Sequence, residues 1–486
     1  MSRSSAEHEK GKREKRRPLV SAIMAALHVV SLAALLCVVC AAIVSRQINP
    51  FYEWIAETPL HRVGQYIVGI LSEQDLLWRR RLAGAPLLQD EEKARQELIS
   101  RIEQTRPTHG VLLTDGRRLF GSLTEIEPGA WTFEFEDKDG VDRLKLTDTD
   151  IRWHKRIVYP PVELMPEDVR FLLNFPNFTY HYLPPYLFVA NVPCNAVQEA
   201  FNILSQLSES FEKEFAPLLP DRERTKLAYV CFFRDEEQYL KYAIEKEDVN
   251  LEVSVGFYSQ TEDCLFVYDR LNSFARAKID RAVERLSRAA SIGTKAIAPE
   301  ELRRLVENER QRSYDALRHQ ITETLRHEGG HQLAFSRGVH SAQGFEHLWV
   351  QEGLAQFCET TPMGAIVPSR MDLLKKAHEA RHLIPWPELV DTPTPRGFAH
   401  YDDRADLAYA QSWLLFRHLM GHQLRARFMV YLDRVHALKP SDLGRPRTAI
   451  FDESVGVPLL EIAHVLKGQL TDHRLTEDLP PLTPRH

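Results

Sequence analysis

Two histidines four positions apart enclose a glutamate in the stretch His327-Glu328-Gly329-Gly330-His331. Side chains at positions i and i+4 lie on the same face of a helix, so both imidazoles can bind one zinc ion. With this spacing, Glu328 points toward a water molecule on the zinc. A catalytic zinc has three protein ligands and an open fourth position, so the stretch predicts a zinc site that still lacks one ligand.

The missing ligand is expected from a second helix. Glu352 follows His331 by 21 positions and lies within 348–359, where apolar residues recur at helical spacing. Residues 336–344 carry turn-forming side chains that can end the first helix and reverse the chain. A helix hairpin of this kind would bring Glu352 beside both histidines and complete the set of ligands.

The first motif, followed by Trp349-x-x-Glu352-Gly353, resembles the gluzincin metallopeptidases. The arrangement is most similar to peptidase-MA-like domains of unknown function of the bacterial membrane-anchored type. The resemblance implies a zincin-like fold in which Glu352 is the third zinc ligand. It also implies that Glu359 hydrogen-bonds to a zinc-bound imidazole and that Tyr409 stabilises the oxyanion.

The predicted activity is that of a zinc metallopeptidase acting on a peptide or protein substrate. Zinc lowers the pKa of its bound water toward about 7. Glu328 is the expected general base, which takes the proton of that water and passes it to the leaving amine. Zinc and the Tyr409 hydroxyl would stabilise the developing oxyanion. Two alternatives stay open: a catalytically silent zinc-binding scaffold or interaction module of the cell envelope, and hydrolysis of another amide or ester.

The segment Gly256-Phe257-Tyr258 is the candidate edge strand for substrate. In the fold that the resemblance implies, such an edge strand binds the substrate backbone by strand addition. Related aminopeptidases carry a Gly-x-Met-Glu-Asn stretch whose glutamate binds the free amine of the substrate. Here the chain continues with Ser259 and Gln260 instead, so an aminopeptidase is not expected.

A second His-Glu-x-x-His pattern occurs at His378 and His382, and Asp403 follows by 21 positions. Two features weigh against a metal there. Lysines and an arginine crowd the pattern with positive charge, and prolines follow it closely. A solvated helix face is the favoured interpretation, with a second metal site as the alternative.

Composition restricts the classes of partner. The net charge of −6 gives no reason to expect a nucleic-acid partner. Of the six cysteines, two lie in an apolar stretch near the amino terminus. The other four allow three disulfide pairings, and the sequence selects none of them. Oligomeric state is not predicted.

The amino-terminal residues predict a membrane anchor. A basic tail at 1–17 precedes a stretch at 18–45 in which no Asp, Glu, Lys or Arg occurs between Leu19 and Val44. About 20 apolar residues are enough to span a bilayer as a helix. The positive-inside rule then predicts a single-pass membrane protein with a cytoplasmic amino terminus and a periplasmic or extracellular catalytic domain. A cleaved signal peptide is the alternative.

The expected fold class is α+β. Residues 46–105 predict a helical, membrane-proximal region, with helices over 64–81 and 90–104. Short alternating strands with Asp-Gly turns over 106–157 predict a small SH3-like β-barrel. Residues 158–479 are assigned to the metallopeptidase domain, which begins with elements in the order β-α-β-α-β-β, and 480–486 to a disordered tail.

Overall fold

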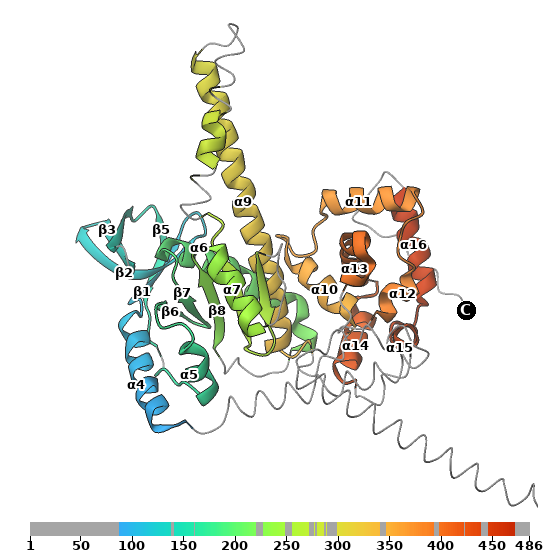
Figure 1. Ribbon diagram of the computed structural model, residues 1–486, viewed down its shortest axis with the longest axis horizontal. Helices are drawn as coiled ribbons and strands as arrows, with labels where there is room; N and C mark the ends of the chain where they lie inside the picture. The colour runs from blue at the N-terminus through green and yellow to red at the C-terminus, as the bar shows by residue number, and fades with distance from the viewer. Residues whose placement is uncertain are drawn as a thin grey trace, which may run out of the picture. The chain divides into compact units, whose positions relative to one another are not determined.

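We describe the protein from a computed structural model (Figure 1). The structure describes residues 87–137, 140–159, 161–219, 227–247, 255–271, 277, 279–285, 288, 299–340, 347–392, 398–421, 423–438 and 446–471. All of them belong to one compact unit of the chain, formed by 75–439 and 445–486. The predicted tail at 1–17, the apolar stretch at 18–45, the helix over 64–81 and the disordered tail at 480–486 lie outside these residues.

The first sheet is antiparallel and open. Its strands have the order β4-β3-β2-β1-β5 and a small apolar core that includes Val111 and Phe133. The bounds are β1 (His109–Leu113), β2 (Arg118–Glu127), β3 (Ala130–Asp137), β4 (Gly140–Thr147) and β5 (Ile151–Arg156). The prediction of a closed SH3-like barrel is therefore wrong, because the two edge strands, β4 and β5, do not pair with each other over the described residues. Nearly every side chain of β5 is exposed, so this strand has no buried face to close against β4.

Two amide side chains hold the open sheet to α6 (Cys194–Phe215), a helix that packs on the second sheet. Gln198 and Asn202 lie one turn apart on this helix. Gln198 accepts from the Phe120 N–H at 3.0 Å and donates to the Phe120 carbonyl at 2.6 Å. Asn202 bonds both backbone groups of Arg118 in the same way, at 2.7 and 2.8 Å. The helix thus pairs with the backbone of β2 much as a neighbouring strand would.

The second sheet has the order β6-β7-β8-β10-β9. The strands are β6 (Thr179–Leu183), β7 (Tyr186–Ala190), β8 (Ala228–Phe233), β9 (Gly256–Ser259) and β10 (Cys264–Tyr268). The β7–β8 and β8–β10 pairs are parallel, and both outer pairs are antiparallel. The three central strands are buried throughout, as expected for continuous apolar runs. The predicted order β-α-β-α-β-β is found from β7 onward, and β6 adds a strand that the sequence did not predict.

Helices cover both faces of this sheet. One face packs against α4 (Gln89–Gln104), α5 (Pro166–Leu172) and α7 (Glu236–Glu247), through a core that contains Leu98, Phe171, Tyr239 and Phe266. The helix predicted over 90–104 corresponds to α4. The other face packs against α6 and α9 (Pro299–Ser336), where Leu265 of β10 lies close to Gly329 of α9. The fold class α+β is thus confirmed.

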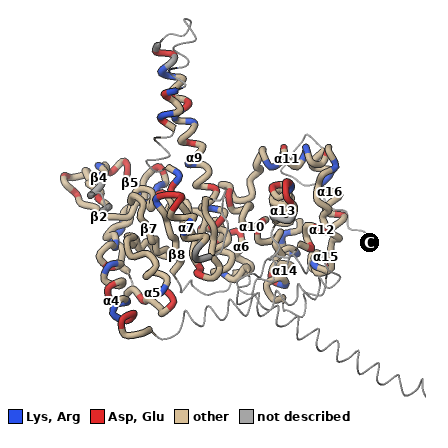
Figure 2. The backbone as a smooth tube through the Cα atoms, in the orientation of Figure 1, with Lys and Arg blue, Asp and Glu red and all other residues tan. Residues whose placement is uncertain are grey.

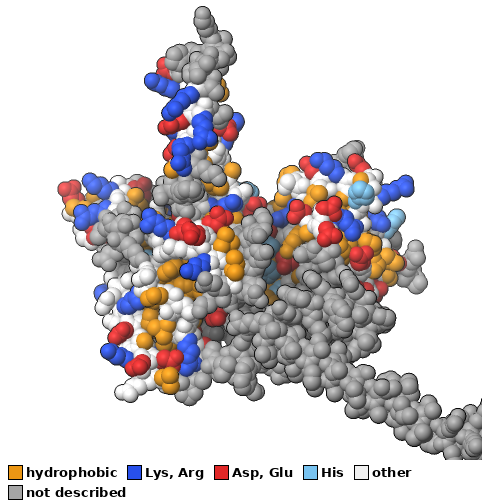
Figure 3. All heavy atoms as spheres, viewed as in Figure 1, with side chains coloured by type: hydrophobic (Ala, Val, Ile, Leu, Met, Phe, Trp, Pro, Cys, Tyr) orange, Lys and Arg blue, Asp and Glu red, His pale blue; other side chains and the backbone are white. Residues whose placement is uncertain are grey.

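Helix α9 is one continuous helix of 38 residues with two different halves. Up to about residue 312 its described side chains are mostly exposed, and charges of both signs alternate along it (Figures 2 and 3). From Ile321 onward most apolar residues are buried, including Leu325 and Leu333. The change from solvated to buried faces therefore occurs within one helix.

The carboxyl-terminal part is helical and is built around α10 and α13. Its elements are α10 (Leu348–Cys358), α11 (Pro368–Glu379), α12 (Trp386–Asp391), α13 (Ala405–Leu419), α14 (Arg425–His436), α15 (Arg447–Val455) and α16 (Leu459–Thr471). Trp349 of α10 is fully buried and stacks on Phe428 and Tyr431 of α14. This aromatic cluster holds the amino-terminal end of α10 in the core.

The predicted membrane anchor and localisation are corrected. Among the described residues, no helix combines the length and the apolar character that a membrane span requires. The longest of them, α9, carries charged side chains along its first half. The predicted single-pass membrane protein with a cytoplasmic amino terminus and a periplasmic or extracellular domain is therefore contradicted.

The four cysteines at 194, 231, 264 and 358 are buried, and none of them is in a disulfide bond. Burial raises the pKa of the Cys231, Cys264 and Cys358 thiols above the ordinary range. A buried thiol in apolar surroundings stays protonated and behaves as a small hydrophobic side chain. None of the three possible disulfide pairings between these cysteines is formed.

His418 on α13 is a buried imidazole inside this helical core. It is 4% exposed, and neither ring nitrogen has a hydrogen-bond partner among the described residues. Burial lowers its pKa to about 4. The folded state therefore binds this proton less readily than the unfolded chain does, so the stability is complete above about pH 6.5 and decreases as the pH falls toward 4.

We predict that His418→Leu makes folding less sensitive to acid. At pH 5 the wild-type imidazole should cost about 2 kcal/mol of unfolding free energy relative to pH 7, and the leucine variant lacks this cost. Urea unfolding at both pH values measures the difference, with the exposed His382→Leu as control. An equal loss between pH 7 and pH 5 in wild type and His418→Leu would contradict the prediction.

Candidate metal centre

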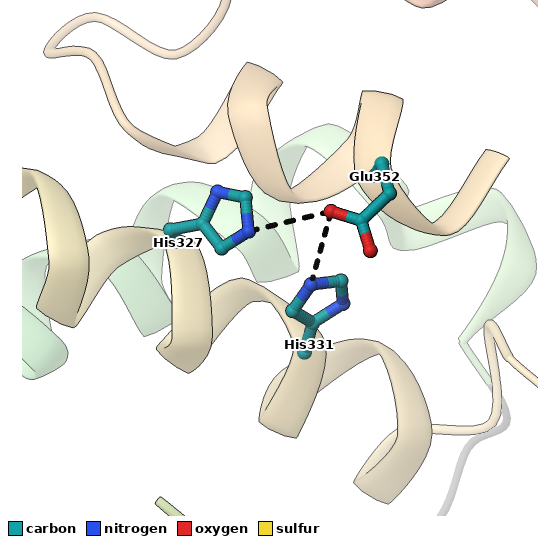
Figure 4. Close-up of side chains that lie close together, drawn as sticks. All are labelled: His327, His331 and Glu352. Carbon is teal, nitrogen blue, oxygen red and sulfur yellow. Dashed lines mark ion pairs between the residues drawn. The ribbon is translucent and has the colours of Figure 1, made fainter. Parts of the chain in front are cut away.

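The carboxyl-terminal half of α9 presents two histidines on one face. His327 and His331 are four positions apart, and their ring centroids lie 5.0 Å from each other (Figure 4). Leu325 and Leu333 are buried on the side that packs into the domain. The burial of these apolar residues fixes the rotation of α9, so both imidazoles face α10.

Glu352 on α10 meets both imidazoles. Its Oε2 atom lies 3.5 Å from His327 Nε2 and 3.8 Å from His331 Nε2, as Figure 4 shows. One possible ligand atom from each of the three residues lies within 4.8 Å of the other two. In the described part of the chain, no other three His, Cys, Asp or Glu residues bring their ligand atoms this close together. The three side chains are between 12% and 19% exposed. The structure thus brings together the three residues predicted as ligands.

The geometry and chemistry of these donors fit a zinc ion. Two imidazole nitrogens and one carboxylate oxygen form the ligand set of catalytic zinc sites in several hydrolases. Around a tetrahedral zinc with ligand bonds of about 2.0–2.1 Å, donor atoms lie about 3.3–3.4 Å apart. The separations of 3.5 and 3.8 Å from Glu352 are slightly larger, and all three donor atoms lie within 4.8 Å of one another.

Charges in this cluster depend on one another. Burial alone would raise the pKa of Glu352, but its contacts with His327 and His331 hold that pKa well below the ordinary value. Burial would lower the pKa of His327, yet the hydrogen bonds to Glu352 and Glu359 raise it well above the ordinary range. Without a metal, a proton on His327 therefore supplies the positive charge between Glu352 and Glu359. A divalent cation that binds there would displace this proton.

Glu359 links His327 to a residue that the sequence did not reveal. Its Oε1 atom lies 2.8 Å from His327 Nδ1. An ionised carboxylate only accepts, so Nδ1 donates, and Nε2 is the nitrogen that would offer its lone pair to a metal. The second Glu359 oxygen accepts from Arg370 on α11. Burial would raise the pKa of Glu359, but the bond to His327 and the Arg370 charge hold it below the ordinary value.

Glu328 points toward the edge strand β9. Its Oε2 atom accepts a hydrogen bond of 2.9 Å from the Tyr258 backbone N–H. Burial raises the pKa of Glu328, although the neighbouring His327 and His331 counteract part of this effect. The proposed general base is therefore held between the metal ligands and the strand predicted to bind substrate.

Tyr409 of α13 faces the same cluster. The negative charge of Glu352, followed by burial and the charge of Glu328, raises the pKa of the Tyr409 hydroxyl. Its ring packs edge-on against Phe398, with centroids 5.0 Å apart. Tyr409 thus keeps its proton and can donate a hydrogen bond.

His340 was not singled out by the sequence, which placed it in the turn after α9. It is 1% exposed, packs against Phe335 and has no hydrogen-bond partner among the described residues. Burial, followed by the nearby His331, lowers its pKa to about 3. His340 therefore adds a neutral ring at the carboxyl-terminal side of the site.

The second His-Glu-x-x-His pattern does not assemble into a site. Helix α11 ends at Glu379, and Arg381 has a φ of +59°, which turns the chain out of the helix. His378 and His382 therefore do not share a helical face. His382 and Asp403 are both exposed, which agrees with the favoured interpretation of a solvated surface.

Two glycines of the ligand-bearing helices allow close packing. A Cβ atom on Gly353 would lie 2.9 Å from the Ser412 carbonyl oxygen of α13. A Cβ atom on Gly329 would lie 2.7 and 2.9 Å from the ends of the Leu204 and Leu207 side chains of α6. The close neighbours of Gly329 are thus side chains of helix α6.

We predict that Gly353→Ala is more destabilising than Gly329→Ala. The added methyl group at Gly353 meets backbone that cannot move without α13, which should cost about 1–3 kcal/mol. Alanine gains about 1 kcal/mol in helix propensity at both positions, but at Gly329 the leucine ends can rotate, so the net loss should be smaller there. Urea unfolding of both variants measures the difference, and equal or reversed losses would contradict the prediction.

Part of the chain matches a protein family. Residues 321–442 match the model of a family described as "Protein of unknown function (DUF1570)". No curated protein matches the chain. The matched segment covers about a quarter of the chain, and the family's description assigns it no activity. It contains His327, His331 and Glu352 together with Glu328 and Tyr409, whereas the edge strand β9 lies outside it.

Proposed function

We propose that the protein is a zinc-dependent peptidase with a zincin-like domain of the gluzincin type. The observation that carries this proposal is the convergence of His327, His331 and Glu352 from two helices, with Glu328 held beside them. The donor set suits zinc, as argued above. When bound, zinc would polarise a substrate carbonyl and acidify a water molecule.

Glu328 is suited to act as the general base. Its carboxylate lies on the same helix as both histidines and is oriented by the Tyr258 N–H at 2.9 Å. Burial moves its pKa upward, which strengthens it as a base at neutral pH. After taking a proton from water, the same carboxyl group can pass it to the leaving amine.

The edge strand β9 is suited to align an extended substrate. It pairs with β10 and forms the end of the sheet. A Cβ atom on Gly256 would lie 2.9 Å from Thr324 of α9 and 2.8 Å from the Phe266 carbonyl oxygen. This glycine lets β9 approach the site helix, while Phe257 stacks on Phe266 at 4.9 Å and anchors the strand. A peptide added along β9 would pass close to Glu328.

Cleavage within a chain is favoured over removal of an amino-terminal residue. The stretch from Gly256 to Gln260 contains no glutamate to bind a free substrate amine. The hydroxyl of Tyr409, on α13, is protonated. It can therefore donate a hydrogen bond to the substrate oxygen on which negative charge develops.

We predict that Glu328→Gln abolishes hydrolysis and leaves zinc bound. The amide cannot accept the proton of water, so cleavage of fluorescently labelled casein should fall by about 10²–10⁴-fold. Zinc content, measured by atomic emission, should stay at the wild-type value. Glu323→Gln, on the same helix and paired with His319 at 3.2 Å, is the matched control and should keep its activity. Full hydrolysis by zinc-loaded Glu328→Gln would overturn the assignment.

We predict that Tyr409→Phe lowers kcat by about 10²–10³-fold, the usual cost of losing one oxyanion donor. KM and zinc content should change little, because the hydroxyl acts in the transition state. Tyr401→Phe removes a hydroxyl bonded to Thr392 at 2.8 Å and serves as the control. A loss confined to KM would assign Tyr409 to substrate binding instead.

A further inference from the structure

We propose that Arg370 is a positioning residue, which holds Glu359 so that His327 presents its Nε2 atom to the metal. This inference rests on the proposed function. It assigns a role to a side chain that lies outside both the ligand set and the groups that act on substrate.

The chain of contacts runs through three helices. His327 of α9 is bonded through Nδ1 to one oxygen of Glu359 at 2.8 Å, at the carboxyl-terminal end of α10. The other oxygen of Glu359 is bonded to Arg370, in the first turn of α11. The Glu359 side chain is only 8% exposed, so these two partners replace the water that would otherwise surround its oxygens.

Arg370 is itself fixed from a fourth helix. Its guanidinium group lies 5.7 Å from the centroid of the Trp413 ring on α13. Trp413 is one turn beyond Tyr409 on that helix, so α13 supports the arginine and carries the proposed oxyanion donor. A planar guanidinium can stack on an aromatic ring and donate to a carboxylate at once, which an ammonium group does less well.

The backbone around Glu359 is held by a different arginine. Arg326, which precedes His327, is 2% exposed and donates to the carbonyl oxygens of Cys358 at 2.8 Å and Thr360 at 2.7 Å. The main chain on both sides of Glu359 is therefore fixed without Arg370. The contribution left to Arg370 is the orientation of the Glu359 carboxylate.

This orientation determines how His327 can act as a ligand. A carboxylate that accepts from Nδ1 fixes the ring and its tautomer, and loss of such a partner typically weakens metal binding by about 10–100-fold. Removing Arg370 frees the carboxylate to rotate away from Nδ1. The effect should appear in metal affinity and should depend on the presence of Glu359.

The test measures zinc affinity of the full chain by competition with a chromophoric chelator. Arg370→Gln should weaken zinc binding by about tenfold, and Arg370→Lys, which keeps the charge, should recover part of this loss. Arg326→Gln is the matched control. It also removes a buried arginine beside Glu359, but this arginine donates to backbone carbonyl oxygens and not to the Glu359 carboxylate. Urea unfolding of each metal-free variant separates affinity from stability.

A double-mutant cycle with Glu359→Gln provides the second measurement. If Arg370 acts through Glu359, Arg370→Gln should have no further effect on zinc affinity in the Glu359→Gln background. Three results would overturn this inference and leave the proposed function standing. The losses of zinc affinity could be additive in the double variant, or Arg370→Gln could bind zinc as tightly as the wild type. Arg370→Gln and Arg326→Gln could also lose affinity equally, in proportion to their loss of stability. A wild-type chain that binds no zinc would overturn the proposed function and this inference with it.

Discussion

The close packing of α10 against α9 is the constraint on which the candidate site depends. A Cβ atom on Gly330 would lie 3.1 Å from the Cβ and Sγ atoms of Cys358, so the two helices come together at a residue without a side chain. At this separation Glu352 reaches both histidines and Glu359 reaches the far side of His327. Glycine in a helix costs about 1 kcal/mol relative to alanine, and here the convergence of three donor groups depends on it.

The close packing of α9 and α10 also brings together buried charges of opposite sign, which compensate one another. Glu352 and Glu359 stand on either side of His327, and Arg370 closes the series at the outer end. Removing one member would leave another buried charge without a partner, which is more costly than the pair is worth. We therefore expect the loss of one of these side chains to disturb the others. Their arrangement depends on the packing of four helices and not on one sequence motif.

Much of the site could be predicted from the sequence because its signals are local. The spacing of His327 and His331 on a helix, and of Glu352 and Glu359 on a second, follows from helical periodicity alone. The buried strands were recognisable as continuous apolar runs. What could not be predicted depends on tertiary contacts: Arg370 comes from a separate helix, the open edge of the first sheet follows from the exposure of β5, and the second motif fails because α11 ends at Glu379.

The zinc content of the full chain tests the account most directly, measured for wild type beside Glu352→Ala and His378→Ala. The account predicts one zinc per chain in the wild type, a sharp loss in Glu352→Ala because only two ligands remain, and no loss in His378→Ala. Zinc absent from the wild type, or undiminished in Glu352→Ala, would contradict it.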